Sequence, residues 1–419
     1  MTSPADPNGA RDRMLLPPSV VYLNAGSFGP LPRSVFEAAA GFRRRLAEEP
    51  TDFLLREAPA LLWRAREQLA GFVGCAPHRL LFTASVSAAV ALVAASLRLN
   101  APGEILLSDQ EYLTMRWCWD RVAERSGLSL RTFAIPQRAS DPEEIVQAAV
   151  GAMGPATRLL FFSHIVSATG LILPARRLCE EAQGRGIVSV VDGAHAVASI
   201  ALELAEIPCD FYVGSCHKWL LAPSGASFLY LGREREERLQ PLTISWGHRS
   251  AQAESAPDER DPFGSTPRLR RLECEGTRDI CPWFAVPEAI GFQRSFGADA
   301  GFAHRRALAG YARERFAESL GWAVATPPDP ALGSAMTAFA VPAQAEPERL
   351  QRTLWERFRI EAAVVDRLGQ PLLRLAPHVY NSRSDIDVLV ESLRALMPPS
   401  PRPRPTADAA AAGTQRQPG

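Results

Sequence analysis

Apolar positions along the middle of the chain follow two different periods. Short apolar runs rich in β-branched residues lie at 80–83, 104–108, 130–135, 158–164, 187–192, 211–215 and 226–232. Helical spacing of apolar residues marks 58–74, 86–97, 111–124, 141–153 and 174–186. The first pattern predicts strands and the second predicts helices. Their alternation predicts βαβ units, and therefore an α/β fold with a mostly parallel, seven-stranded sheet covered on both faces.

The pattern changes after Pro282. Two helices are expected first, followed by strands near 335–342, 359–365 and 372–378, a helix from about Pro347, and a closing helix opened by Ser384. Segregated strands and helices predict a smaller α+β domain. The predicted domains are listed in chain order: a leader over 1–19, a large α/β domain over 20–282 whose first segment packs on the small domain, the small α+β domain over 283–397, and a tail over 398–419 too polar to fold.

Composition narrows the class of protein. The formal net charge is zero, so no long-range field attracts nucleic acid or an anionic membrane. The seven cysteines are odd in number and never spaced as C-x-x-C, which argues against a disulfide framework or a zinc site. The N-terminus lacks the apolar segment of a signal peptide, and the longest apolar run is too short to cross a bilayer. We expect a cytoplasmic enzyme without a metal and with a small-molecule substrate.

The polar stretch from about Arg249 to Arg268 predicts a loop or lid.

Lys218 is the one lysine of the chain, since 45 of the 46 basic residues are arginine. Arginine can replace lysine wherever a positive charge is enough. An amine that must lose its proton and attack a carbonyl cannot be replaced in this way, because a guanidinium stays protonated. Lys218 is therefore a candidate Schiff-base residue, although the count alone is equally compatible with chance survival on a loop.

Neighbouring residues favour the chemical interpretation. Asp192 follows one predicted strand, and Ser215, His217 and Lys218 follow the next. The carboxyl ends of parallel strands lie at one edge of a sheet, where active sites form. An aspartate in that place often only caps a turn. Two adjacent strand ends nevertheless present an acid, a hydroxyl, an imidazole and the chain's only lysine amine.

Pyridoxal phosphate (PLP) chemistry requires such a set. The amine binds the cofactor aldehyde, and a carboxylate keeps the pyridine nitrogen protonated. A helix N-terminus can hold the phosphate, and "FTASVSAAVALV" offers one at Ser85, Val86 and Ser87. A plain serine N-cap explains any one of these residues, but not why cap, acid and lysine share an edge.

Several long motifs together resemble a known family. They are "SHIVSATGLILP", "VDGAHA", "GSCHKWLLAPSGASFLYL", "EGTRDICPWFAVPEAI" and "LLRLAPHVYNSRSDID". The chain resembles the class V aminotransferase group of fold-type-I PLP-dependent enzymes, and within it the isopenicillin N epimerase-like branch. The resemblance runs in order from "VYLNAGSFGPLP" to the last helix. It implies the fold-type-I PLP-dependent transferase fold and PLP as cofactor.

The resemblance also implies roles for single residues. Lys218 would bind the cofactor and Asp192 would face the pyridine nitrogen. His195 would contact the phenolic oxygen, Tyr112 would stack on the ring, and Arg374 would hold the substrate α-carboxylate bidentately. Each of the last three has a structural alternative, as a satisfied histidine, a core aromatic residue and an ion-pair residue.

Further positions follow from the same motifs. The phosphate side would comprise Ser85, Val86, Ser87, Ser215 and His217. Ser167 would lie near cofactor and substrate, with Asn24 and Ser27 on the substrate side. Thr277 would reach the phosphate across a subunit interface, which implies a homodimer with shared active sites.

The sequence departs from the family pattern at several places. Ser85 and Ser167 stand where Asn is usual, and Ala25 stands where His is common. These changes predict a substrate other than that of the epimerase. No cysteine precedes Arg374 in "RIEAAVVDRLGQPLLR", which argues against the persulfide chemistry of cysteine desulfurases.

Several functions remain open at this level. The first is a PLP enzyme acting at Cα of an amino acid or amino-acid conjugate, by epimerisation or by elimination of a β-substituent such as a thiolate. The second is an aminotransferase, and the third is a binding protein that kept the fold and lost the chemistry. A nicotinamide-binding protein ranks last, because no G-x-G-x-x-G follows an early strand.

Overall fold

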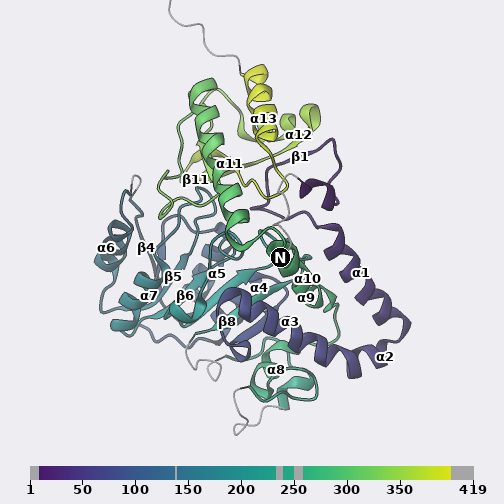
Figure 1. Cartoon of the computed structure of the whole chain (residues 1–419). Helices are drawn as coiled ribbons and strands as arrows, with labels where there is room; N and C mark the ends of the chain where they lie inside the picture. Colours follow the sequence, from purple (N-terminus) through teal and green to yellow (C-terminus); the bar gives the residue numbers. More distant parts are fainter. Residues whose placement is uncertain (1–8, 137–138, 233–238, 250–257, 398–419) are drawn as a thin grey trace, which may run out of the picture.

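A seven-stranded sheet forms the centre of the molecule. The computed structural model describes residues 9–136, 139–232, 239–249 and 258–397 (Figure 1). The sheet order is β2 (Leu80–Thr83), β8 (Ser227–Leu231), β7 (Phe211–Ser215), β6 (Val188–Asp192), β5 (Thr157–Ser163), β3 (Glu104–Ser108) and β4 (Ser129–Phe133). Only β8 runs antiparallel to its neighbours within this sheet. The mostly parallel, seven-stranded α/β sheet expected from the sequence is confirmed.

Alternate residues of each strand enter two hydrophobic cores. In β7, Tyr212 belongs to one core, whereas Phe211 and Val213 belong to the other. This alternation follows from the period of two along a strand. The first core is covered by α1 (Arg33–Glu48), α3 (Ala58–Val73), α6 (Pro142–Ala152), α7 (Ala175–Gly184), α9 (Cys281–Phe284) and α10 (Val286–Arg294). The second is covered by α4 (Val86–Ser96), α5 (Leu113–Ser126) and α8 (Pro267–Glu273).

The C-terminal elements form a smaller unit, seen at the top of Figure 1. Its antiparallel sheet has the order β11 (Ala363–Arg367), β12 (Gln370–Leu375) and β9 (Thr337–Ala340). Its helices are α11 (Ala298–Ser319), α12 (Pro347–Phe358) and α13 (Arg383–Leu396). The N-terminal strand β1 (Val21–Tyr22) pairs in parallel with β10 (Ile360–Glu361), and Leu23 joins the same core as these helices. An early segment of the chain therefore packs against late elements.

Short elements connect these parts. They are the short helix α2 (Pro50–Asp52), the π-helical turn Phe53–Glu57, and the 3-10 turns Arg11–Arg13, Pro77–Arg79, Leu204–Glu206 and Trp246–Arg249. Among the described residues, no helix is both long enough and apolar enough to cross a bilayer.

The closing helix and the loop before α8 have boundaries that differ from those expected from the sequence. The closing helix is capped by Ser382 rather than opened by Ser384, because the Asp385 carboxylate accepts from the Ser382 N–H at 2.9 Å in a capping box. The loop expected up to Arg268 ends earlier, since Thr266 caps α8 by accepting from the Leu269 N–H. Residues 250–257 of that loop, and the tail 398–419, lie outside the described residues.

Candidate active site

The turn after β6 fixes a buried carboxylate at the edge of the sheet. Asp192 ends β6 and is 5% exposed. Its Oδ1 accepts a hydrogen bond from the Ala194 N–H at 2.9 Å. A Cβ at Gly193 would lie 2.1 Å from the Tyr212 ring, so only glycine fits here. The sequence "DGA" thus forms a tight turn that holds the carboxylate at the end of β6, where Asp192 lines a cavity.

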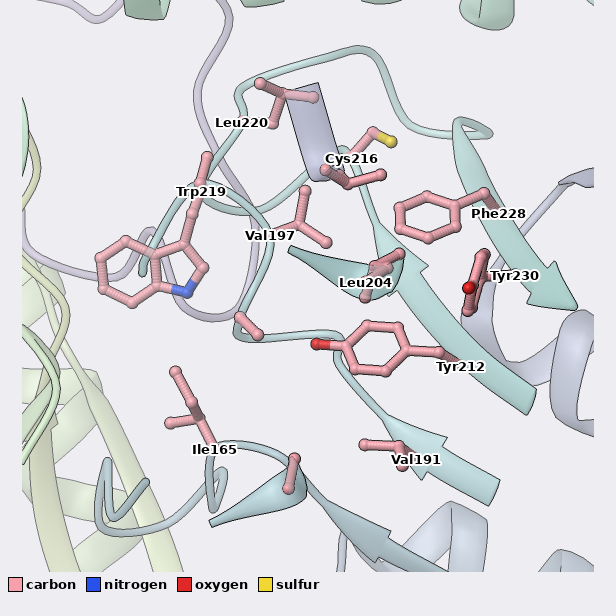
Figure 2. Packing of buried hydrophobic residues seen from close by; sticks show 14 of the residues in the cluster. Ile165, Val191, Val197, Leu204, Tyr212, Cys216, Trp219, Leu220, Phe228 and Tyr230 are labelled. Carbon is pink, nitrogen blue, oxygen red and sulfur yellow. The ribbon is translucent and has the colours of Figure 1, made fainter. Parts of the chain in front are cut away.

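The segment after β7 is anchored by hydrophobic packing. Cys216, Trp219 and Leu220 are fully buried on either side of Lys218, and Figure 2 shows them packed in the hydrophobic core beside the sheet. The backbone is also held from the N-terminal loop, where the Gly29 N–H donates to the His217 carbonyl at 2.8 Å. The backbone at Lys218 is therefore fixed, while its side chain lines a cavity.

A cavity of about 370 Å³ opens at this edge. It is lined by Gly26, Ser27, Phe28, Ser85, Val86, Ser87, Tyr112, Met115, Ser163, Ile165, Ser167, Asp192, Ala194, His195, Ser215, His217, Lys218, Val365 and Arg374. Asn24 lies behind this lining, where its side chain bonds to Arg374. Of the predicted site residues, only Thr277 lies elsewhere in the described chain. It lines a second hollow, of about 530 Å³, together with Trp246 and Leu55.

The amine of Lys218 lies in an environment that favours its neutral form. Its Nζ is 3.3 Å from Nε2 of His195. Burial and the charge of Arg374 lower the pKa of Lys218 to about 8, against the opposing attraction of Asp192. Burial also lowers the pKa of His195 well below its usual value, with the cations Lys218 and Arg374 acting in the same direction. His195 is therefore a neutral imidazole at neutral pH, and the pKa of the Lys218 amine lies close to neutral pH.

Arg374 is a buried cation that makes hydrogen bonds but no ion pair within the described chain. Nη1 donates to the carbonyl and hydroxyl of Ser167, at 2.8 and 3.3 Å. Nη2 donates to Asn24 Oδ1 at 3.2 Å and to Ser27 Oγ at 2.7 Å. Burial lowers the pKa of Arg374 to about 10, so it stays charged at neutral pH. A fixed guanidinium without a counterion is suited to bind a carboxylate.

The N-terminus of α4 supplies a positive end of a helix dipole to the same cavity. Ser85 is the N-cap, and its Oγ accepts from the Ala88 N–H at 3.1 Å. The N–H groups of Val86 and Ser87, in the first turn, have no acceptor within the helix. Such an end binds phosphate groups. The same cavity thus offers a helix N-terminus suited to a phosphate and a guanidinium suited to a carboxylate.

The family model for class V aminotransferases matches residues 21–389. The chain belongs to the class V aminotransferase family. It is 58% identical to isopenicillin N epimerase of Streptomyces clavuligerus over 392 residues, which cover 94% of this chain and 98% of that enzyme. It is 53% identical to isopenicillin N epimerase of Amycolatopsis lactamdurans over 390 residues, covering 92% and 98% respectively.

A solved structure shares the fold. It is a lysine-to-alanine variant of C-DES with glycine covalently linked to its PLP cofactor, and it aligns with a TM-score of 0.79. The two sequences are 21% identical, and the alignment covers 91% of this chain and 98% of that one. The fold-type-I architecture expected from the sequence is confirmed.

The cavity of this class V aminotransferase-family enzyme fits PLP, on which the family depends. An amine, a buried carboxylate and a helix N-terminus face one space. Nδ1 of His195 is buried and has no hydrogen-bond partner within the described chain. The amine suits the PLP aldehyde, the carboxylate suits the pyridine nitrogen, and the helix N-terminus suits the phosphate.

Glu111 was not singled out from the sequence. It accepts hydrogen bonds from the Ser163 N–H at 3.0 Å, from the Ser163 hydroxyl at 2.6 Å, and from the Ser108 hydroxyl. Burial raises the pKa of Glu111 to about 7, although these hydrogen bonds act against the rise, and nearby Asp192 adds to it. A carboxylate three residues after a buried strand and directly before Tyr112 was the available signal, since the ends of parallel strands lie at the functional edge of the sheet.

Proposed function

We propose that this PLP-dependent enzyme epimerises an amino-acid centre, and that its substrate is isopenicillin N. The observation that carries the proposal is the 58% identity to an isopenicillin N epimerase over 98% of that enzyme's length. The cavity supports it, because Lys218, Asp192 and Arg374 line the same space.

Each residue has a part in this proposal. Arg374 binds the α-carboxylate and so orients the Cα–H bond. Lys218 removes the Cα proton, and its lowered pKa makes the neutral amine available near neutral pH. Inversion is completed when a proton is delivered to the opposite face of Cα. Asp192 would hold a proton at the pyridine nitrogen of bound PLP, and Tyr112 would cover its ring. When bound, PLP supplies the electron sink that stabilises a negative charge at Cα.

Two further groups of residues complete the proposal. His195 would face the phenolic oxygen of bound PLP. Ser85, Val86, Ser87, Ser215 and His217 would hold its phosphate, and Ser167, Asn24 and Ser27 fix Arg374. Their hydrogen bonds to its Nη1 and Nη2 support this role.

The departures at Ser85, Ala25 and Ser167 predicted a different substrate. This difference in substrate stays a prediction. We give the greater weight to the identity over nearly the full length of two epimerases, because three side chains alone do not specify a substrate.

The test uses the purified holoenzyme with isopenicillin N in deuterated water. We expect the Cα–H signal to disappear by NMR while the opposite epimer accumulates on a chiral column. Formation of ammonia and an α-keto acid would instead indicate elimination. Cysteine S-conjugates are the probes for this reaction, because their elimination releases a thiol. Conversion that stops until an α-keto acid is added would indicate an aminotransferase. Absence of exchange with every amino acid tested would favour the non-catalytic alternative.

We further propose that the enzyme is a cytoplasmic homodimer. Thr277 lines a hollow with Leu55 and Trp246, outside the cavity of its own chain. This placement supports a contact with the cavity of a second copy. All seven cysteines are free thiols, which agrees with a reducing compartment.

A further inference from the structure

A second arginine lies on the cavity side of the β11–β12 hairpin. Val365 and Arg367 are two residues apart in β11 and therefore point to the same face. Val365 lines the cavity together with Arg374. Val364 and Leu373 point the other way, into the core of the smaller unit. Arg367 is thus displaced from the cavity lining by one repeat of the strand, toward the tip of the hairpin.

Arg367 is tethered to the loop that carries Tyr112. Its Nε donates to Oε1 of Gln110 at 3.0 Å. No carboxylate within the described chain forms an ion pair with this guanidinium, and Asp109 acts on it only at longer range. Gln110 is itself 7% exposed, and its Nε2 donor has no partner among the described residues. A guanidinium and a buried amide donor therefore meet at one place without an anion.

The spacing between the two arginines suits a long substrate. Arg374 pairs across the ladder with Ala363, which lies four residues before Arg367. At the rise of a β-strand, this separates the two positions by about 13 Å. A compound held by its α-carboxylate at Arg374 would reach Arg367 only with a long side chain that carries a second anionic group.

We propose that Arg367 and the Gln110 amide form a distal carboxylate subsite that determines substrate specificity. A planar guanidinium binds a carboxylate with two parallel hydrogen bonds, so the subsite recognises geometry as well as charge. The inference rests on the proposed function, because it concerns the far end of the same substrate. Isopenicillin N has the required form, with an amino-acid carboxylate at one end and a second carboxylate on its ring.

The test compares isopenicillin N with its ring-carboxylate methyl ester. The two compounds differ only at the distal group. Their dissociation constants are measured from the change in the visible absorption of the holoenzyme, a readout that does not require turnover. We expect the wild-type enzyme to bind the free acid about 10- to 100-fold more tightly than the ester, as for loss of a charge-assisted hydrogen bond.

The variants are Arg367→Gln and Arg367→Lys. In Arg367→Gln we expect acid and ester to bind equally, and in Arg367→Lys we expect partial discrimination, because an ammonium keeps the charge but not the fork. Arg357→Gln is the matched control, since it removes an exposed charge from α12. This variant should retain the wild-type ratio of the dissociation constants of ester and acid.

The outcomes separate the two proposals. Equal binding of acid and ester by the wild-type enzyme would overturn the subsite, as would unchanged discrimination in Arg367→Gln. Discrimination by the wild-type enzyme that is lost in Arg367→Gln would support the subsite even if no epimer forms, and in that case only the proposed function would fail.

Discussion

At the scale of single residues, Lys218 allows an unusually clean test. We predict that borohydride treatment of the holoenzyme fixes the cofactor to the peptide that contains Lys218. The chain has no other lysine, so no other side-chain amine competes. The measurement is peptide mass spectrometry after digestion. The native protein should also show a visible absorption band, which Lys218→Ala should lose. A protein that stays colourless with added PLP would contradict the assignment.

Glu111 gives a second prediction, about stability and pH. Its carboxyl ionises near pH 4.5 when unfolded and at about 7 in the folded protein. The folded state therefore binds more protons between these values, and stability falls as the pH rises through about 7. The loss is up to about 3 kcal/mol, because each pKa unit corresponds to about 1.4 kcal/mol. The side chain of Glu111→Gln does not titrate, so the stability of this variant does not fall with pH for this reason.

The measurement is the thermal unfolding midpoint of wild type and Glu111→Gln at pH 5 and pH 8. We expect the difference in midpoint, variant minus wild type, to be about 3 °C larger at pH 8 than at pH 5. Equal differences at both pH values would mean that Glu111 does not titrate in this range.

At the scale of elements, the turn between β11 and β12 fixes the face on which each side chain lies. Leu368 and Gly369 have φ values of 51° and 82°. Two consecutive positive φ values are typical of a type I′ turn, for which Asn-Gly is favoured. A shift of register by one residue would turn Val365 and Arg367 away from the cavity.

We predict opposite effects of substitution at these two positions. Leu368→Asn should stabilise the protein by about 1 kcal/mol, because asparagine adopts positive φ more readily than leucine. Gly369→Ala should destabilise it by about the same amount, through backbone strain alone, since no atom lies within 4 Å of the added Cβ. Thermal unfolding should show shifts of about 1 °C in opposite directions. Shifts of the same sign would contradict this description of the turn.

The sequence predicted local elements well, because the two periods of burial directly reflect strand and helix geometry. Each strand predicted for the large sheet lies within two residues of the observed one. Asp192, Lys218 and Arg374 could be placed in one site because strand ends share an edge and the motifs resemble a family. The pairing of β1 with β10 had no local signal, since it joins positions more than 300 residues apart. Arg367 and Glu111 were missed for a related reason, because their importance depends on tertiary neighbours.

At the scale of the whole molecule, exposed apolar side chains support a subunit interface. Leu242, Ile244 and Trp246 are 53%, 65% and 89% exposed, and Leu55 near the same hollow is 57% exposed. Clustered exposure of this kind is costly in a monomer and typical of an interaction surface. A second copy is the expected occupant, because Thr277 lines the same hollow.

We predict a particle of twice the chain mass of 45.6 kDa in sedimentation equilibrium. Trp246→Glu should shift the protein toward the monomer and weaken PLP binding, because the phosphate would lose its contact with Thr277 of a second copy. Val388→Glu, at an exposed apolar position of α13, should leave the mass unchanged. A wild-type monomer with full cofactor affinity would contradict the shared site.

The pairing of β1 with β10 also has a consequence for synthesis on the ribosome. Asn24 and Ser27 emerge early in translation, but Arg374, which they support, emerges among the last fifty residues. The partners of β1, Ile360 and Glu361, lie within the last sixty residues. Because domains fold as units and from the N-terminus during synthesis, the large sheet can form long before these contacts exist. A chain that terminates prematurely before Ile360 would therefore keep its lysine and its sheet but lack a finished substrate site.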